Sequence, residues 1–264
     1  MDELSLARQM ADIAAEIALK YFGHHPDASI KQDGTLVTIA DREIEKTLRA
    51  RITSEFPKHA ILGEEEGLIG DPSSPTWIID PIDGTNNFAA SIPVFATLIA
   101  LRTNGRTELG VANAPALNER YEAARGDGAT MNGTPIKVSD ITEFSEATIC
   151  FGSYKRMRES GYGPQVETML TQCRRDRGFG DFWGHMLVAR GALEMMAEPS
   201  LAIWDVAALQ VIVEEAGGNI TGFSGHPYPD SRMQSTDGDG SCVSTNGHLH
   251  QEVLSYLGPH RPAA

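Results

Sequence analysis

The chain has 264 residues, enough for one large domain or two small ones, and its hydrophobic fraction of 41% is ordinary for a folded globular protein. The formal net charge of −14 makes it a poor candidate for binding the phosphate backbone of DNA or RNA. No apolar run approaches the ~18 residues that a membrane span needs. We therefore expect neither nucleic-acid nor membrane partners.

The start of the chain and its cysteines predict a cytoplasmic protein. The first residues, M-D-E-L-S-L-A-R-Q-M, are acidic and lack the pattern of a signal peptide. Cys150, Cys173 and Cys242 are widely spaced and odd in number, which suits a reducing compartment and forms no zinc signature. We expect buried, unreactive thiols.

The first elements in chain order are two helices separated by a loop and a strand. Apolar side chains at helical spacing over residues 4–22 predict an amphipathic helix that ends at Gly23. A loop with a D-G turn and the strand L-V-T-I follow within residues 24–40. Asp41 then opens a second helix, which Pro57 stops.

The next segment joins an apolar strand directly to two aspartates. A short strand at 60–63 precedes it, and T-W-I-I-D-P-I-D-G-T-N-N-F follows at 76–88. We expect a buried strand that ends at Asp80, because Pro81 cannot continue a central ladder. A pair of carboxylates at a strand end is unfavourable without a nearby lysine, helix N-terminus or metal ion.

The rest of the chain alternates strand and helix patterns, which indicates a layered α/β protein. We expect strand-and-turn segments from Val94 to about Val138, with a hairpin at 104–105. Helices are expected at 160–173 and 184–192, and the segment 193–197 is either a strand or the end of the second helix. A further helix is expected from Asp205 to Gly217. We expect one catalytic unit over residues 1–264, with an N-terminal half to about 140, a C-terminal half over 141–258, and a disordered tail at 259–264.

Acidic side chains recur where one element gives way to the next: Asp41, Glu64, Glu65, Asp80, Asp83 and Asp205. Helix capping is the simpler interpretation of Asp41 or Asp205 alone, and a solvated loop is simpler for the glutamates. An Asx turn accounts for one of Asp80 and Asp83, but not for both. Together, Glu64, Asp80, Asp83 and Asp205 could supply the oxygen ligands that Mg²⁺ prefers.

The turn after Asp83 could bind phosphate. The backbone N–H groups near Gly84 and Thr85 begin a helix, and helix N-termini bind anions. Three rival motifs fail: an EF-hand needs its glycine at the sixth position, the haloacid dehalogenase group uses D-x-D-G-T rather than the D-x-x-D-G-T found here, and there is no P-loop.

The motifs G-E-E-E at 63–66, W-I-I-D-P-I-D-G-T-N-N-F at 77–88 and W-D-V-A-A-L-Q-V-I-V-E-E-A-G-G at 204–218 closely resemble the inositol monophosphatase family. L-V-T-I-A-D at 36–41 fits the upstream acidic element of that family. The resemblance implies an α/β fold in an αβαβα five-layer sandwich, of the type shared with fructose-1,6-bisphosphatase. It also implies hydrolysis of small phosphate monoesters with two or three Mg²⁺ ions, Mn²⁺ as a possible substitute, lithium sensitivity and a homodimer.

Residue roles follow from the same resemblance. It implies metal ligands at Glu64, Asp80, the Ile82 carbonyl, Asp83 and Asp205. It implies that Asp41 and Thr85 position and deprotonate the attacking water, that Glu65 assists, and that the Gly84 and Thr85 amides hold phosphate. Lys31 is either a basic residue near the site or a solvated surface lysine.

The segments R-G-F-G-D-F-W at 177–183 and M-L-V-A-R-G-A-L-E-M-M-A-E-P at 186–199 look most like the histidinol-phosphatase branch of the family. Asp181 and Glu198 could pair with the ammonium or imidazole of histidinol phosphate, and Trp183 could pack on its ring. The alternative is that Trp183 is a core residue and Asp181 a helix cap. Arg190 lies on a helix surface or reaches a neighbouring subunit's site.

Three other functions stay open. An inositol-1-phosphate or broad sugar-phosphate phosphatase would use the same motifs. A nucleotide 3′-phosphatase would need an added basic or adenine-binding segment, which we do not find. An inactive relative with a binding or regulatory role would have lost at least one motif carboxylate or the threonine, and none is missing.

Overall fold

The computed structural model describes residues 2–23, 28–30, 36–227 and 240–258. The predicted D-G turn at 33–34, Lys31 and the predicted tail at 259–264 lie outside the described residues.

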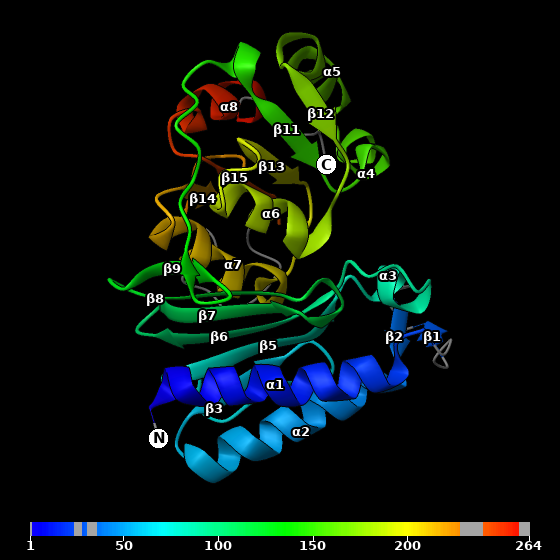
Figure 1. Ribbon diagram of the computed structural model, residues 1–264, viewed down its shortest axis with the longest axis vertical. Coiled ribbons are helices and arrows are strands. Elements are labelled where there is room, and N and C mark those ends of the chain that lie inside the picture. The colour runs from blue at the N-terminus through cyan, green and yellow to red at the C-terminus, as the bar shows by residue number, and fades with distance from the viewer. Residues whose placement is uncertain (1, 24–27, 31–35, 228–239, 259–264) are drawn as a thin grey trace.

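The fold has five layers, in the order helices, sheet, helices, sheet, helices (Figure 1). The outer helices on one side are α1 (Glu3–Tyr21) and α2 (Ile39–Glu55), the middle helices are α6 (Asp181–Ala189) and α7 (Ile203–Glu215), and the outer helices on the other side are α4 (Tyr154–Glu159), α5 (Gly163–Gln172) and α8 (His250–Leu257). The predicted αβαβα sandwich is therefore confirmed.

The first sheet has eight strands in the order β10-β9-β8-β7-β6-β5-β3-β4. Their bounds are β3 Ala60–Gly63, β4 Gly67–Ile69, β5 Thr76–Asp83, β6 Ala96–Thr103, β7 Arg106–Ala114, β8 Glu119–Ala124, β9 Gly128–Met131 and β10 Thr134–Pro135. The only parallel pair in this sheet is β3 with β5. Asn104 and Gly105 both have positive φ and join β6 to β7, as the hairpin signal predicted.

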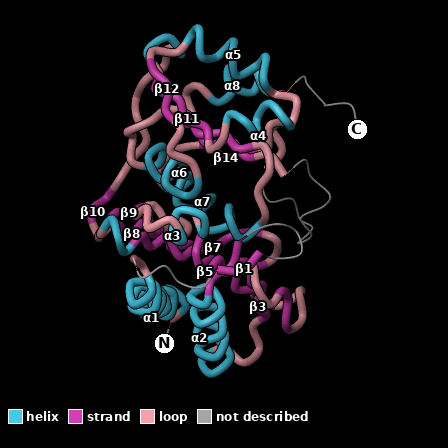
Figure 2. The backbone as a smooth tube through the Cα atoms, turned by 90° about the vertical axis from the view of Figure 1, so that its right-hand side faces the viewer, coloured by secondary structure: helices cyan, strands magenta, loops and turns pink. Residues whose placement is uncertain are grey.

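The second sheet has five strands in the order β12-β11-β13-β15-β14. Their bounds are β11 Thr148–Phe151, β12 Arg175–Arg177, β13 Met195–Glu198, β14 Asn219–Thr221 and β15 Cys242–Thr245. The smaller elements are the hairpin of β1 (Ala28–Ile30) and β2 (Leu36–Thr38), the helix α3 (Thr85–Ala89), and 3₁₀ turns at Pro115–Leu117 and Phe144–Glu146. The tube view in Figure 2 shows the two sheets on either side of α6 and α7.

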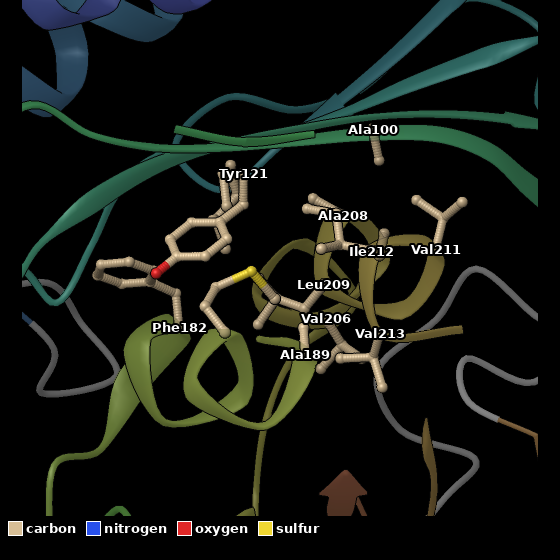
Figure 3. Close-up of a cluster of buried hydrophobic side chains, with 14 of the residues drawn as sticks. Ala100, Tyr121, Phe182, Ala189, Val206, Ala208, Leu209, Val211, Ile212 and Val213 are labelled. Atoms are coloured by element: carbon tan, nitrogen blue, oxygen red, sulfur yellow. The ribbon is translucent and has the colours of Figure 1, made fainter. Parts of the chain in front are cut away.

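Strand β5 is apolar at consecutive positions because helices cover both faces of its sheet. Successive strand side chains point to opposite faces. Trp77 and Ile79 pack with α1 and α2, whereas Ile78 packs with α7. Figure 3 shows the core on the α7 side, where Tyr121 of β8, Phe182 of α6 and Leu209 of α7 point toward one another.

The prediction that β5 ends at Asp80 was wrong. The strand continues through Pro81 to Asp83, and its register against β6 shifts between Asp80 and Asp83. A bulge interrupts the ladder, so a proline there removes no regular hydrogen bond. Both aspartates therefore belong to one bulged strand end.

Several predicted helix starts were also displaced. Helix α2 begins at Ile39 after the cap Thr38, and α7 begins at Ile203. Asp41 and Asp205 are consequently the third residues of their helices, and each accepts a hydrogen bond from the backbone N–H that precedes its helix. The helix predicted at 160–173 is α5, which begins only at Gly163; a separate α4 precedes it.

Two further expectations concern residues 181–198 and the cysteines. Helix α6 begins at Asp181 rather than at 184, and the ambiguous 193–197 segment belongs to β13. The three cysteines are free; Cys150 and Cys242 are buried, and Cys173 is half-buried. Among the described helices, none has the length and apolarity that crossing a membrane requires.

Candidate active site

Three carboxylates converge where β5 meets the first turn of α7. Oxygens of Asp80, Asp83 and Asp205 all lie within 4.8 Å of one another. The bulge in β5 delivers the first two, and the third residue of α7 delivers the other. A strand of the first sheet and a helix of the middle layer thus form one acidic cluster, which we define by these three residues.

The cluster concentrates negative charge at a partly buried place, where Asp80 is buried and Asp83 and Asp205 are half-buried. Burial raises the pKa of Asp80 well above its ordinary value, and the nearby charge of Glu64 raises it further. Burial likewise raises the pKa of Asp83, with Asp181 as the next cause. Burial raises the pKa of Asp205 to about 7. These carboxylates destabilise one another's ionised form and would be stabilised by a cation.

The donor atoms fit a hard divalent cation. Asp80 is 2% exposed, and its Oδ1 has no hydrogen-bond partner in the described part of the chain. An orphaned carboxylate oxygen at such depth needs a donor or an ion. Carboxylate oxygens from separate chain segments are ligands that Mg²⁺ accepts.

Asp41 and Thr85 form a second group beside the acidic cluster. Asp41 Oδ2 accepts hydrogen bonds from the Thr38 N–H at 2.8 Å and the Thr38 hydroxyl at 2.5 Å. Its Oδ1 lies 3.5 Å from the Thr85 hydroxyl, which donates to the Ile82 carbonyl at 2.9 Å. Burial raises the pKa of Asp41 to about 6, with Glu64 adding to the rise. The structure therefore brings Asp41, Thr85 and Ile82 together with Glu64.

Glu45 supports the loop that carries Glu64 and Glu65. It is fully buried on α2 and accepts hydrogen bonds from the Glu65 N–H at 2.8 Å and the Glu66 N–H at 2.9 Å. The Arg49 guanidinium balances the charge of Glu45, with 2.8 Å between Arg49 Nη2 and Glu45 Oε1. The sequence analysis missed Glu45; its signal was a Glu–Arg pair on the buried face of a helix.

Gly84 shapes the turn between β5 and α3. Its φ is +83°, and a Cβ would lie 2.9 Å from the Val94 carbonyl oxygen. Glycine is therefore required by both backbone conformation and space. Gly84 is also the cap residue of α3 and supplies no side chain to its first N–H groups.

Asp181 connects α6 to the acidic cluster. Its carboxylate accepts a hydrogen bond from Asn87 at 2.8 Å, and the next N–H, of Phe182, donates to Asp83 at 2.7 Å. Its backbone has a φ of +50°, which is unusual for a residue other than glycine. Burial raises the pKa of Asp181 to about 6, and the charge of Glu198 adds to this.

Glu198 ends β13 and is 5% exposed. A Cβ on Gly152, at the end of β11, would lie 2.0 Å from Glu198 Oε1, so the carboxylate occupies the space that glycine leaves. Glu198 Oε2 lies 3.5 Å from Nε2 of His185, a buried residue that the sequence analysis did not single out.

Trp183 and Arg190 bind a common acceptor that was also missed. Glu119, the first residue of β8, accepts hydrogen bonds from Trp183 Nε1 at 3.0 Å, Arg190 Nη1 at 3.0 Å and the Tyr121 hydroxyl at 2.7 Å. These bonds join α6 to the first sheet. Direct contact of Trp183 or Arg190 with a substrate stays a prediction.

Known proteins with similar sequences identify the class of phosphatase to which this layered fold and its carboxylate-rich site belong. A family model described as the inositol monophosphatase family matches residues 2–260. Two similar proteins are the histidinol-phosphatase of Mycobacterium tuberculosis, 40% identical over 97% of this chain and 98% of that protein, and the histidinol-phosphatase of Chlorobaculum parvum, 38% identical over 97% and 96%.

A similar solved structure is an IMPase from Thermotoga maritima, with a TM-score of 0.86 and 32% identity over 97% of each chain. The chain belongs to the inositol monophosphatase family. The predicted family is thereby confirmed, and the family and its relatives indicate a phosphoric monoester hydrolase.

Proposed function

We propose that this chain is an Mg²⁺-dependent histidinol-phosphatase of histidine biosynthesis, which hydrolyses histidinol phosphate to histidinol and phosphate. The observation that supports this substrate is the half-buried Asp181 beside the acidic cluster, with the charge of Glu198 close enough to raise its pKa. Two carboxylates next to a phosphate site favour a leaving group that carries positive charge. The relatives named histidinol-phosphatase support this choice.

The metal-binding part of the proposal uses two sets of ligands. Glu64, Asp80 and the Ile82 carbonyl would hold one cation, and Asp80, Asp83 and Asp205 a second, with Mn²⁺ as a possible substitute and a third, weaker ion near Glu64. When bound, such cations lower the pKa of water and stabilise charge on phosphate oxygens.

Asp41 and Thr85 are proposed to prepare the attacking water. Asp41 Oδ2 is fixed by Thr38, which leaves Oδ1 facing the Thr85 hydroxyl. A carboxylate with a pKa near 6 is a suitable proton acceptor close to neutral pH. Glu65 would assist from the loop that Glu45 holds. Water oriented there would attack phosphorus in line, without a covalent enzyme intermediate.

Gly84 and Thr85 are proposed to hold the phosphate through their backbone N–H groups. Gly84 is left-handed and caps α3 directly after β5, and the N–H groups of a first helical turn bind anions. Asp181 and Glu198 would then bind the ammonium or imidazole of the leaving group. Trp183 of α6 and Arg190, the residue that caps this helix, would also contact the substrate. Both side chains are held by Glu119.

The proposal also covers a homodimer, a cytoplasmic location and sensitivity to lithium. All three are expectations from the family resemblance and from the chain's composition. Light scattering on the purified protein would test the dimer, and inhibition by LiCl at fixed Mg²⁺ would test the lithium effect.

The second candidate is an inositol-1-phosphate or sugar-phosphate phosphatase. Similar solved structures carry inositol monophosphatase names, and an inositol-1-monophosphatase of Synechocystis sp. is 37% identical over 85% of this chain and 77% of that protein. Glu198 supports a substrate contact in either case. An inactive relative is disfavoured because Asp41, Thr85 and the acidic cluster lie together.

The deciding experiment measures phosphate release with Mg²⁺ and compares kcat/KM for histidinol phosphate and inositol 1-phosphate on one preparation. A preference of at least 100-fold for histidinol phosphate is expected, since two charge-assisted contacts are worth about that much or more. A preference for inositol 1-phosphate, or none, would leave the metal chemistry in place and reject the proposed substrate.

A further inference from the structure

His185 is a buried titratable residue that lies behind the proposed substrate contacts. It belongs to α6 and is 1% exposed. Its Nδ1 lies 2.7 Å from the hydroxyl of Ser244 on β15, and its Nε2 lies 3.5 Å from Glu198 Oε2. The imidazole therefore links two neighbouring strands of the second sheet.

The Ser244 hydroxyl determines which imidazole nitrogen carries the proton. Among the described residues, Nδ1 of His185 is the only side-chain partner of this hydroxyl. A buried hydroxyl with a single partner satisfies its hydrogen by donating to it. In a neutral imidazole, Nδ1 then accepts and Nε2 carries the hydrogen. This hydrogen faces Glu198.

The Glu198 carboxylate packs against Gly152. Gly152 leaves the space that Oε1 fills, since a Cβ there would lie only 2.0 Å away. Within the described residues, neither Glu198 Oε2 nor His185 Nε2 has a hydrogen bond of normal geometry. The two unsatisfied buried atoms face each other at 3.5 Å, so each is the nearest available partner for the other.

We propose that His185 is a positioning residue for substrate recognition, whose Nε2–H donates to Glu198 and holds that carboxylate toward the leaving group. The inference rests on the proposed function in one respect, the role of Glu198 as a substrate contact. Its range is wider than one substrate, because the relay from Ser244 through His185 would orient Glu198 toward any polar or cationic leaving group.

The first test replaces His185 by Leu and by Gln. His185→Leu removes the donor, and we expect KM for histidinol phosphate to rise roughly tenfold or more with a smaller change in kcat. His185→Gln places an amide N–H near the Nε2 position, so we expect it to restore most of the loss. Ser244→Ala removes the hydroxyl that fixes the tautomer of His185, and it should raise KM by a smaller factor.

His250→Leu is the matched control. His250 is also buried in this half, and its two ring nitrogens contact Thr245 and Thr221 at 3.0 and 3.1 Å rather than a carboxylate. It should lower the melting temperature without changing KM. An equal rise in KM for His250→Leu would show that loss of packing alone explains the effect, and would overturn the proposal.

A double-mutant cycle separates this inference from the choice of substrate. In a Glu198→Gln background, His185→Leu should have little further effect on KM, because its target charge is gone. An undiminished effect would overturn the proposal. If the wild type prefers inositol 1-phosphate, the proposed function fails, and the same cycle on that substrate still decides the role of His185. If His185→Leu does not fold, Ser244→Ala decides the question. An unchanged KM for Ser244→Ala, or a rise in KM that is equally large with and without Glu198→Gln, would overturn the proposal.

Discussion

The acidic cluster and the surroundings of Glu198 are built in different ways. Asp80 and Asp83 lie three residues apart on one bulged strand, and Asp205 is the third residue of the helix that packs against this strand. The surroundings of Glu198 instead draw on α6 and the ends of β11, β13 and β15. The groups proposed for phosphate chemistry thus come largely from short motifs, whereas those proposed for substrate choice come from the packing of separate elements.

The largest expected effect is on the acidic cluster itself. Asp83→Asn keeps an oxygen that can accept the Phe182 N–H but removes the charge. We expect Mg²⁺-dependent phosphate release to fall at least about 1,000-fold, because a lost metal ligand removes charge stabilisation at the reacting phosphate.

The control for this substitution is Asp127→Asn, which changes an exposed aspartate and should leave turnover unchanged. Circular dichroism would check that both variants are folded. Turnover retained by a folded Asp83→Asn protein would remove Asp83 from the metal site.

A second prediction concerns the electrostatic repulsion within the cluster. Burial raises the pKa of Asp205 to about 7 in the folded protein, against 3.8 as its ordinary value. Stability from the protonated carboxyl is fully present below about pH 4 and is lost as pH rises through about 7. In metal-free protein, Asp205→Asn should therefore become more stable relative to wild type over this interval, by up to a few kcal/mol.

Urea denaturation with a chelator at several pH values would measure this difference. Adding Mg²⁺ at pH 7.5 should then stabilise wild type more than Asp205→Asn, because a bound cation favours the ionised carboxylate. A difference in free energy of unfolding that does not change between pH 4 and 7.5 would contradict the interpretation of Asp205 as a destabilised anion.

The next prediction addresses the substrate side. Asp181→Ala removes a half-buried carboxylate that Asn87 orients. We expect kcat/KM for histidinol phosphate to fall about 10- to 100-fold, with a loss several times smaller for a neutral sugar phosphate. Steady-state kinetics with both substrates would measure the two losses. Equal losses would show that Asp181 does not bind the charged part of the leaving group.

The smallest expected effect comes from Glu119, which accepts hydrogen bonds from side chains of α6 and of the first sheet. Glu119→Ala leaves Trp183, Arg190 and Tyr121 without their acceptor. We expect a loss of about 1–3 kcal/mol in the free energy of unfolding, because half-buried donors lose their partner. Denaturant titration would measure it.

Glu119→Gln is the matched variant, since its amide oxygen still accepts one or two of these hydrogen bonds, and it should be less destabilised. Kinetic losses that are equal for cationic and neutral substrates would identify the Glu119 contacts as structural. A loss specific to histidinol phosphate would instead favour direct substrate contact by Trp183 or Arg190.

Much of the fold followed from local patterns. The amphipathic helix at the start, the N-G hairpin and the apolar strand before Asp80 each depend on neighbours within a few residues. The exact ends did not follow, because the bulge that carries β5 past Pro81 depends on pairing with β6. Asp41 and Asp205 were expected at helix starts, and the structure places them there two residues inside the helix.

The sequence by itself determined the family, the layered fold and the acidic residues that could hold a cation, since these reside in contiguous motifs whose residue types have few other physical uses. Only the tertiary structure decided what supports them. Glu45, Glu119 and His185 have no motif of their own, and their polar atoms acquire a role through partners on other elements, up to 71 positions away in the chain. Burial makes those pairings necessary, because a polar group removed from water must find its partner wherever the fold brings one.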